Sequence, residues 1–412
     1  MTPHQLKLVI DKELSSVKVT DVHTHLFPAQ FGQMLLYGID EVLTYHYLIA
    51  EFFRYSSMEY DEFFKLPKAK QADLVWQTLF LDRSPVSEAQ RGALTVLSRL
   101  GLDVRSRSLA EYRQYYRSRT MSQQIDTVFE LAGINEVVMT NDPFDAQERK
   151  LWQSGAGKED PRFKAALRID PLLMDYENSH KLLQAEGYQV DAQLGRESAS
   201  EVRRFLTDWV KTMSALYLAV SLPPDFNVSD NSLRTRLVKE CVLPVCKEQG
   251  IPFALMIGVK KLVNPGLNLA GDSVGKADIR VLEELCTNYP QNKFLVTMLA
   301  RENQHELAIT ARKYRNLMVF GCWWFLNNPS IVKEITALRL ETLGLSFIPQ
   351  HSDARVLEHL IYKWDHSKTI IGQVLREKYE DMQATGWPLT TEGIEQDIQA
   401  LFQNNFYDFL AR

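Results

Sequence analysis

Eight short apolar runs recur along the chain, and longer stretches with helical periodicity separate them. The runs are rich in β-branched and aromatic residues, and most are apolar without alternation, which is typical of parallel strands buried on both faces. We expect strands at 17–26, 134–140, 163–169, 215–222, 252–259, 293–299, 317–325 and 346–355. Helical patterns fill the intervals at 201–212, 232–248, 278–288, 303–314 and 329–343.

A strand that alternates with a helix eight times predicts an α/β fold of the (β/α)8 TIM-barrel type. The competing architecture is an open doubly wound sheet. That fold usually has fewer strands, and no GxGxxG turn follows the first apolar run here. The pattern therefore favours the barrel.

Two segments exceed a minimal barrel. A helical stretch rich in aromatic residues (31–131) follows the first expected strand, and helices run from the eighth strand to the end of the chain. No Pro-rich or Ser-rich linker separates them, so we expect one barrel domain over 1–412. The segment 31–131 follows a strand, which predicts a helical lid at the mouth of the barrel, where active-site loops gather.

The composition narrows the function classes. The 412 residues are 45% hydrophobic and 24% charged, with a net charge of -5, and this acidic balance argues against nucleic acid as a partner. No apolar run approaches the roughly 20 residues that span a bilayer, and the N-terminus does not resemble a signal peptide. The four cysteines lack CxxC spacing and are expected to be reduced core residues (Cys241, Cys246, Cys286 and Cys322). We expect a cytoplasmic protein with no membrane partner.

The first strand ends in Asp21-Val22-His23-Thr24-His25-Leu26. Side chains two apart in a strand share a face, so His23 and His25 are expected to point together into the barrel near its carboxyl end. Two converging imidazoles suit a divalent metal such as zinc. A pair of hydrogen-bonded histidines with a packing role is the alternative.

The last expected strand carries Asp353 and Arg355 on one face. Closure of the barrel pairs this strand with the first, so we expect Asp353 to join His23 and His25 as a third metal ligand. Two histidines and one carboxylate leave coordination positions open, as a catalytic metal requires. The alternative is a structural ion pair between Asp353 and Arg355.

These residues resemble the amidohydrolase superfamily of metal-dependent barrels. The motifs Leu43-Thr44-Tyr45-His46-Tyr47, Gly321-Cys322-Trp323-Trp324-Phe325 and Asp353-Ala354-Arg355 resemble, more narrowly, the uronate isomerase family, in the same order over nearly the whole chain. The resemblance implies interconversion of D-glucuronate with D-fructuronate and of D-galacturonate with D-tagaturonate, with one divalent metal ion, zinc by expectation.

The resemblance also implies roles for single residues. Arg168 and Arg355 would contact the substrate, since an arginine fork matches a carboxylate. His46 and Tyr47 match the family's His-Tyr pair in the insertion, with Tyr47 as the base or acid at C2. A free tyrosine has a pKa near 10, so a basic Tyr47 needs a stabilised phenolate. Asp353 would move a proton from a sugar hydroxyl.

Several features depart from the hydrolases of the superfamily. The fourth expected strand has no lysine and the sixth has no histidine, while Met256 stands where many uronate isomerases have histidine. Trp323 and Trp324 are expected to end the seventh strand on opposite faces, with Trp324 as a wall for the sugar.

A metal-dependent hydrolase of an amide, lactone or ester remains the alternative function, and a sugar-acid-binding protein without activity is a third. A homo-oligomer is left open.

Overall fold

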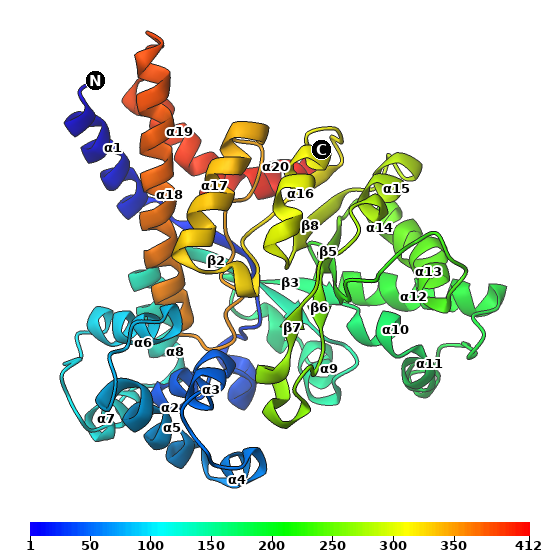
Figure 1. The fold of residues 1–412 in the computed structure, drawn as a ribbon. Coiled ribbons are helices and arrows are strands. Elements are labelled where there is room, and N and C mark those ends of the chain that lie inside the picture. Colours follow the sequence, from blue (N-terminus) through cyan, green and yellow to red (C-terminus); the bar gives the residue numbers. More distant parts are fainter.

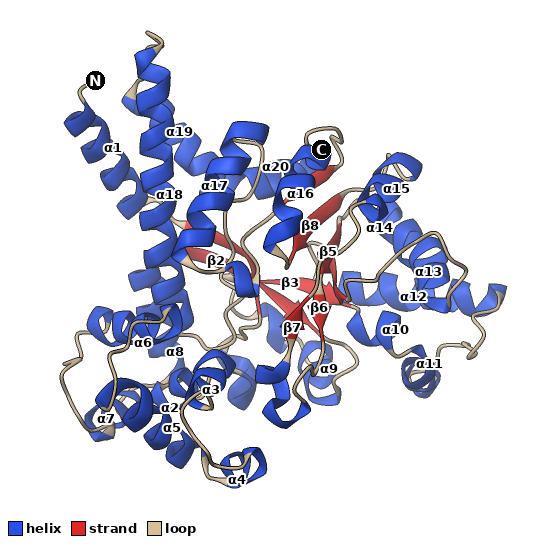
Figure 2. Cartoon of the chain, viewed as in Figure 1, coloured by secondary structure: helices blue, strands red, loops and turns tan.

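The computed structural model describes all residues, 1–412. Seven strands form one curled parallel sheet in the order β1-β2-β3-β4-β5-β8-β9. Their bounds are β1 Val19–Thr24, β2 Ile134–Asn141, β3 Phe163–Arg168, β4 Leu218–Leu222, β5 Phe253–Ile257, β8 Phe294–Met298 and β9 Leu317–Val319. Each lies within or overlaps one of the first seven expected strands. Figure 2 shows the strands at the centre of the molecule with helices around them.

The expected eighth strand at 346–355 is not formed, and this prediction was wrong in detail. Only an isolated bridge joins Ile348 to Phe320 of the β9 side. Further along, the Asp353 N–H donates to the carbonyl of His23, and the His25 N–H donates to that of Ala354. The segment therefore lies between the two edges of the sheet without a regular ladder to either.

Side chains explain the missing ladder. Oε1 of Gln350 accepts the backbone N–H groups of Cys322 and His351, at 2.9 and 3.0 Å. Oδ1 of Asp21 accepts the N–H of Ser352 at 3.0 Å. A buried N–H that bonds a side chain is satisfied but adds nothing to a strand pairing. Polar side chains thus replace the strand pairing in this segment.

The seventh strand also ends earlier than expected. β9 stops at Val319, and the chain turns at Gly321 with φ 67°. A side chain at Gly321 would collide with the ring of His351, because its Cβ would lie 1.8 Å from Nδ1. Trp324 opens a short 3-10 helix, η7 Trp324–Leu326. The two tryptophans therefore do not alternate on a strand, and both pack into one interior cluster.

The helices surround the sheet (Figure 1). The first eight are α1 Pro3–Ser16, α2 Ile39–Leu43, α3 His46–Phe52, α4 Tyr60–Lys65, α5 Lys68–Trp76, α6 Glu88–Arg99, α7 Ala110–Arg117 and α8 Met121–Ala132. The next six are α9 Ala146–Gln153, α10 Asp170–Met174, α11 Tyr176–Ala185, α12 Arg196–Met213, α13 Leu233–Leu237 and α14 Leu243–Gln249. The last six are α15 Arg280–Asn288, α16 Gln304–Ala311, α17 Pro329–Leu343, α18 His359–Ala384, α19 Thr391–Gln399 and α20 Asn405–Ala411.

Local signals set the helix ends that lead into the sheet. Thr120 caps α8 with a capping box, and Gly133 ends it in a left-handed conformation (φ 67°) directly before β2. Glycine adopts this conformation at little cost, which allows the sharp change of direction. The long helix α18 packs against α1, α6, α8 and α17. It follows the 346–355 segment and continues past the amino ends of β1 and β2 (Figure 1).

The segment 31–131 is helical, as expected, and forms its own hydrophobic cluster around α2 to α7. A short antiparallel hairpin, β6 Val259–Lys260 with β7 Ser273–Val274, extends from β5 toward it. The amide of Asn264 in this hairpin donates to the hydroxyl of Tyr60 in α4, at 3.2 Å. The assignment of 31–131 as a lid within one domain stays a prediction.

The four cysteines are buried and unpaired, which confirms the expectation of reduced core residues. No helix combines the length and the apolar character that crossing a bilayer requires. The expected cytoplasmic location and the open question of a homo-oligomer stay predictions.

Candidate active site and metal centre

Three side chains expected to hold a metal lie together at the carboxyl end of β1. His23, His25 and Asp353 each offer one ligand atom, and these atoms all lie within 4.8 Å of one another. Nε2 of His25 is 3.2 Å from Oδ1 of Asp353, and Nε2 of His23 is 3.7 Å from the same oxygen. The prediction that these three groups meet is therefore confirmed by the geometry.

Two hydroxyl groups orient the imidazoles. The Thr140 hydroxyl donates to the carbonyl of Thr24, so its oxygen accepts from Nδ1 of His25 at 2.8 Å. The Tyr217 hydroxyl donates to the carbonyl of Val22 and in the same way faces Nδ1 of His23 at 3.4 Å. With the proton on Nδ1, each Nε2 keeps its lone pair toward Asp353. This is the arrangement that metal-binding histidines have in proteins.

The charge states suit a divalent cation. Burial lowers the pKa of His23 and of His25 to about 3, so both rings are neutral near pH 7. Burial also opposes ionisation of Asp353, but the pKa of Asp353 is held well below its usual value, and Arg355 is the permanent positive charge beside it. Two neutral imidazoles and a carboxylate fit zinc and similar ions.

Oδ1 of Asp353 is buried without a hydrogen-bond donor. It faces the lone pairs of two imidazole nitrogens, and such a set of acceptors is unfavourable unless a cation or a donor lies among them. The guanidinium of Arg355 already approaches Nε2 of His25, at 3.3 Å. The two imidazole nitrogens and the carboxylate oxygen therefore fit a bound divalent metal ion.

The backbone at Asp353 is strained. Its φ is 50°, in the left-handed region that only glycine adopts freely. Such a conformation costs on the order of 1–3 kcal/mol and tends to occur at functional sites. Because of it, Asp353 reaches the histidines although it is not on a strand. Trp324 has a similar φ of 47°.

The aromatic residues of the insertion and of η7 lie beside one another. The ring of His46 is 4.5 Å from that of Tyr47, 4.0 Å from that of Tyr45 and 5.5 Å from that of Trp324. The hydroxyl groups of the two tyrosines, both ring nitrogens of His46 and Nε1 of Trp324 are all buried without a partner. Most buried polar atoms in proteins are paired, so this concentration makes the cluster a candidate binding site for a polar molecule.

Tyr47 is not a phenolate in the resting protein. Burial raises its pKa well above 10, and the neighbouring Tyr45 phenol and Asp353 carboxylate act in the same direction, while Arg355 acts in the opposite direction. His46 is neutral, because burial lowers its pKa well below 6.5. Both residues thus present uncharged polar groups.

The arginines separate into two kinds. Arg355 contacts His25, and Arg168 at the end of β3 lies near enough to lower the pKa of both candidate ligand histidines, His23 and His25. Arg168 is held by Asp170, with Nε 3.0 Å from Oδ2. Arg301, by contrast, is more than half exposed and pairs with Glu334 at the surface.

Sequence reasoning missed the supporting residues. Thr140 could have been found as a polar residue near the carboxyl end of a buried strand, but Tyr217 reaches the site from the opposite end of β4 and leaves no sequence signal. Lys363, buried in α18, stands out only as a lone lysine in the apolar run His359-Leu360-Ile361-Tyr362-Lys363-Trp364. Met256 is buried in the interior cluster and is not one of the grouped ligands.

The fold and the site define a class: α/β enzymes that can hold a divalent metal ion at the carboxyl edge of a curled parallel sheet. Protein-family models and curated proteins give no match to the sequence. Solved structures do.

A uronate isomerase from Bacillus halodurans C-125 is 53% identical, covers 100% of this chain and 97% of its own, and superposes with a TM-score of 0.98. A uronate isomerase from Thermotoga maritima (14% identity, 98% and 97% covered) and a glucuronate isomerase from Caulobacter crescentus (16% identity, 99% and 94% covered) have TM-scores of 0.80 and 0.77 and share the fold. The 53% identity over the full length shows that the chain belongs to the uronate isomerase family.

Proposed function

We propose that this protein catalyses the reversible aldose–ketose isomerisation of hexuronates, D-glucuronate to D-fructuronate, D-galacturonate to D-tagaturonate, or both. The observation that carries the proposal is the meeting of His23, His25 and Asp353 beside the unpartnered groups of His46 and Tyr47. The family membership supports it. We further infer that the segment after β9 takes the place of the eighth strand of a closed barrel.

His23, His25 and Asp353 are the proposed ligands of one divalent ion, for which zinc is our first choice. When bound, such an ion polarises a carbonyl or hydroxyl oxygen of the substrate as a Lewis acid. Arg355 and Arg168 are proposed to hold the substrate carboxylate, since the fork of a guanidinium matches its two oxygens.

Isomerisation moves a proton between C2 and C1 and needs a place for the charge that develops on oxygen. Tyr47 is the proposed proton-transfer group at C2. Because its pKa is raised, its phenolate has to form in the complex, with Arg355 as the neighbouring positive charge. Asp353, ionised at rest, is suited to accept a proton from a sugar hydroxyl. His46 and Trp324 are proposed to hold the sugar beside Tyr47.

A panel of sugars tests the proposal with purified protein of known metal content. We expect ketose formation from D-glucuronate, D-galacturonate or both, followed by NMR, with no water added to the product. D-glucose and D-galactose lack the carboxylate, so their kcat/KM should be lower by about 100-fold or more. Failure to convert any hexuronate by metal-loaded protein would refute the proposal.

Arginine variants test the carboxylate contacts. Arg168→Met and Arg355→Met should each reduce kcat/KM for the hexuronate by about 10- to 1000-fold. Arg301→Met is the matched control, since Arg301 pairs only with Glu334 at the surface. It should leave kcat/KM unchanged.

A further inference from the structure

Ser352, the residue before Asp353, is held from two sides by buried charged groups. Its N–H donates to Oδ1 of Asp21 at 3.0 Å, and its carbonyl accepts a hydrogen bond from Nζ of Lys363. Neither charged side chain is exposed by more than 2%. One backbone residue thus links a buried carboxylate to a buried ammonium group.

The Asp21 side is well defined. Asp21 precedes His23 by two positions in β1 and therefore shares its inward face. Its second oxygen accepts from Nε1 of Trp364 at 2.8 Å, so both oxygens of the carboxylate are engaged. The Ser352 hydroxyl in turn accepts the N–H of Ala354 at 3.1 Å. Hydrogen bonds to Asp21 and to the Ser352 hydroxyl therefore fix the backbone on both sides of Asp353.

Lys363, the second group that holds Ser352, lies on one face of α18. His359, Lys363 and Ser367 are spaced four apart and lie on that face. Ser367 accepts a hydrogen bond from the amide of Gln350 at 3.1 Å, and Lys363 contacts Ser352, so this face of α18 runs along the segment 350–353. The chain there cannot relax into a regular strand while these bonds hold.

We propose that Lys363 and Asp21 are positioning residues that keep Asp353 in its left-handed conformation and thereby preform the metal centre. The proposal rests on the proposed function only for the identity of the metal ligands. Neither group forms a hydrogen bond with a ligand atom, and the Lys363 ammonium also lies 5.9 Å from the centre of the Tyr47 ring. They act through the peptide groups of Ser352, because loss of either bond allows φ of Asp353 to leave 50° and carries its carboxylate away from His23 and His25.

A merely structural role is the competing explanation, because breaking a buried charge pair by removing one partner is strongly destabilising in any protein. Three variants separate the two: Lys363→Met, Asp21→Asn and the double variant. The double variant leaves no uncompensated charge, and the single amide oxygen of its asparagine can accept one of the two N–H bonds that the two oxygens of Asp21 accept. It should recover part of the thermal stability that Lys363→Met loses.

Metal affinity of the apoprotein is the deciding readout, measured by competition with a chromophoric chelator. We expect Lys363→Met to weaken zinc binding by about 10- to 100-fold. The double variant should stay weakened although it is stable. At saturating zinc, kcat should remain at least about tenfold reduced and KM for the hexuronate should change by less than about threefold. A double variant with wild-type zinc affinity and kcat would overturn the proposal.

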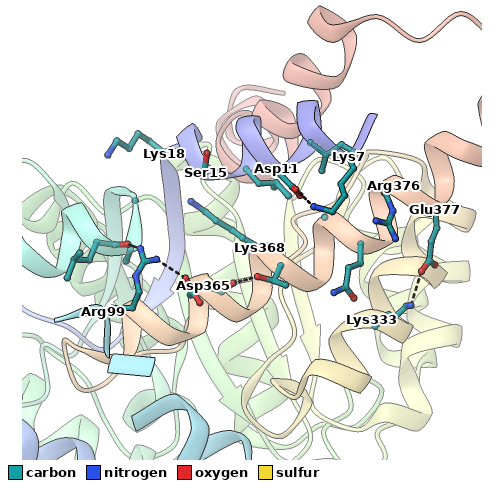
Figure 3. A pocket seen from close by; sticks show the side chains of 18 of the residues that line it. Lys7, Asp11, Ser15, Lys18, Arg99, Lys333, Asp365, Lys368, Arg376 and Glu377 are labelled. Atoms are coloured by element: carbon teal, nitrogen blue, oxygen red, sulfur yellow. Dashed lines mark hydrogen bonds and ion pairs between the residues drawn. The ribbon is translucent and has the colours of Figure 1, made fainter. Parts of the chain in front are cut away.

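Lys368 offers a matched control on the same helix. Its Nζ also donates to a backbone carbonyl, that of Val17, at 3.0 Å, but it lies in the groove shown in Figure 3, at the amino ends of β1 and β2. Burial lowers the pKa of both lysines to about 8. Lys368→Met should leave zinc affinity within about twofold of wild type. An equal loss of affinity in Lys363→Met and Lys368→Met would also overturn the proposal.

Failure of the proposed function gives a different result. Wild-type protein that binds no zinc, or that binds it and converts no hexuronate, contradicts the proposed metal site or activity. Wild-type protein that binds zinc tightly, with Lys363→Met binding it equally well, contradicts only the positioning role.

Discussion

Two regions at opposite ends of the strands differ in what their polar groups contact. One region is the groove between α1, α8 and α18, at the amino ends of β1 and β2. It has a volume of about 800 Å³ and is lined by six basic and four acidic residues among others. Most of its charges are paired with each other, as Lys7 with Asp11, Arg99 with Asp365 and Lys333 with Glu377 (Figure 3).

At the carboxyl end of the strands the polar groups are buried and many have no partner. A cavity of only about 10 Å³ lies between the insertion and α18, beside Tyr45 and Tyr47. Volume alone would therefore point to the groove as the binding site. The unpartnered buried groups point to the carboxyl end of the strands instead. A ligand that pairs with these groups lowers the free energy, whereas the surface charges of the groove are already paired. Four predictions test this contrast.

The largest effect is expected from Asp353→Asn. The substitution removes the negative charge that faces both imidazoles and the group suited to accept a hydroxyl proton. We expect kcat/KM to fall by about 10³-fold or more, together with a large loss of zinc affinity. Steady-state kinetics and metal analysis of the same preparation measure both. Near-normal turnover would exclude Asp353 from the reaction.

Acid should destabilise the apoprotein through the site. The pKa of His23 and of His25 is about 3 in the folded protein and 6.5 in the unfolded chain, so the unfolded state binds more protons as the pH falls. Their stabilisation is nearly complete above about pH 7 and is lost as the pH falls toward 3; the loss approaches about 3 kcal/mol per pH unit for the two together below about pH 5.5, where the unfolded histidines are protonated. Urea unfolding between pH 7 and pH 5 measures it. His25→Gln should have a shallower pH dependence than the wild type.

Thr140→Val tests the tautomer of His25. Without the hydroxyl, Nδ1 of His25 loses its acceptor, and Nε2 no longer has a fixed lone pair. Zinc affinity should decrease by about 10- to 100-fold with little change in fold. Thr127→Val is the control, since that hydroxyl bonds only within and beside α8 at the surface. Equal zinc affinity in the two variants would show that Thr140 does not orient the ligand.

The smallest effect is expected in the groove. Glu377→Gln removes the partner of Lys333, where both side chains are nearly half exposed. Such a surface pair contributes at most about 1 kcal/mol, so thermal stability should change little, and kcat/KM should not change. A loss of activity would show that the two ends of the strands are coupled.

Sequence patterns located seven strands because each is a continuous apolar run that needs burial on both faces. The eighth could not be predicted in detail, because its N–H groups bond to side chains of Asp21 and Gln350, and sequence periodicity does not reveal which side chains compete with a ladder. The early end of β9 depends on the approach of His351 to Gly321, which is a tertiary contact.

The candidate ligands were predictable because side chains two positions apart in a strand share a face, which brings His23 and His25 together, and because the carboxyl ends of parallel strands lie at one edge of the sheet. That Asp353 reaches them in a left-handed conformation was not. The partners of the imidazoles come from β2 and from before β4, far away in the sequence, so their roles follow only from the folded chain.

The most direct test of the account is the rate of hexuronate isomerisation as a function of metal occupancy. Apoprotein is loaded with zinc in steps, the bound metal is measured, and ketose formation is followed by NMR. The account predicts a rate that rises in proportion to occupancy and saturates at one ion per chain. Full activity in protein without metal, or none in fully loaded protein, would contradict it.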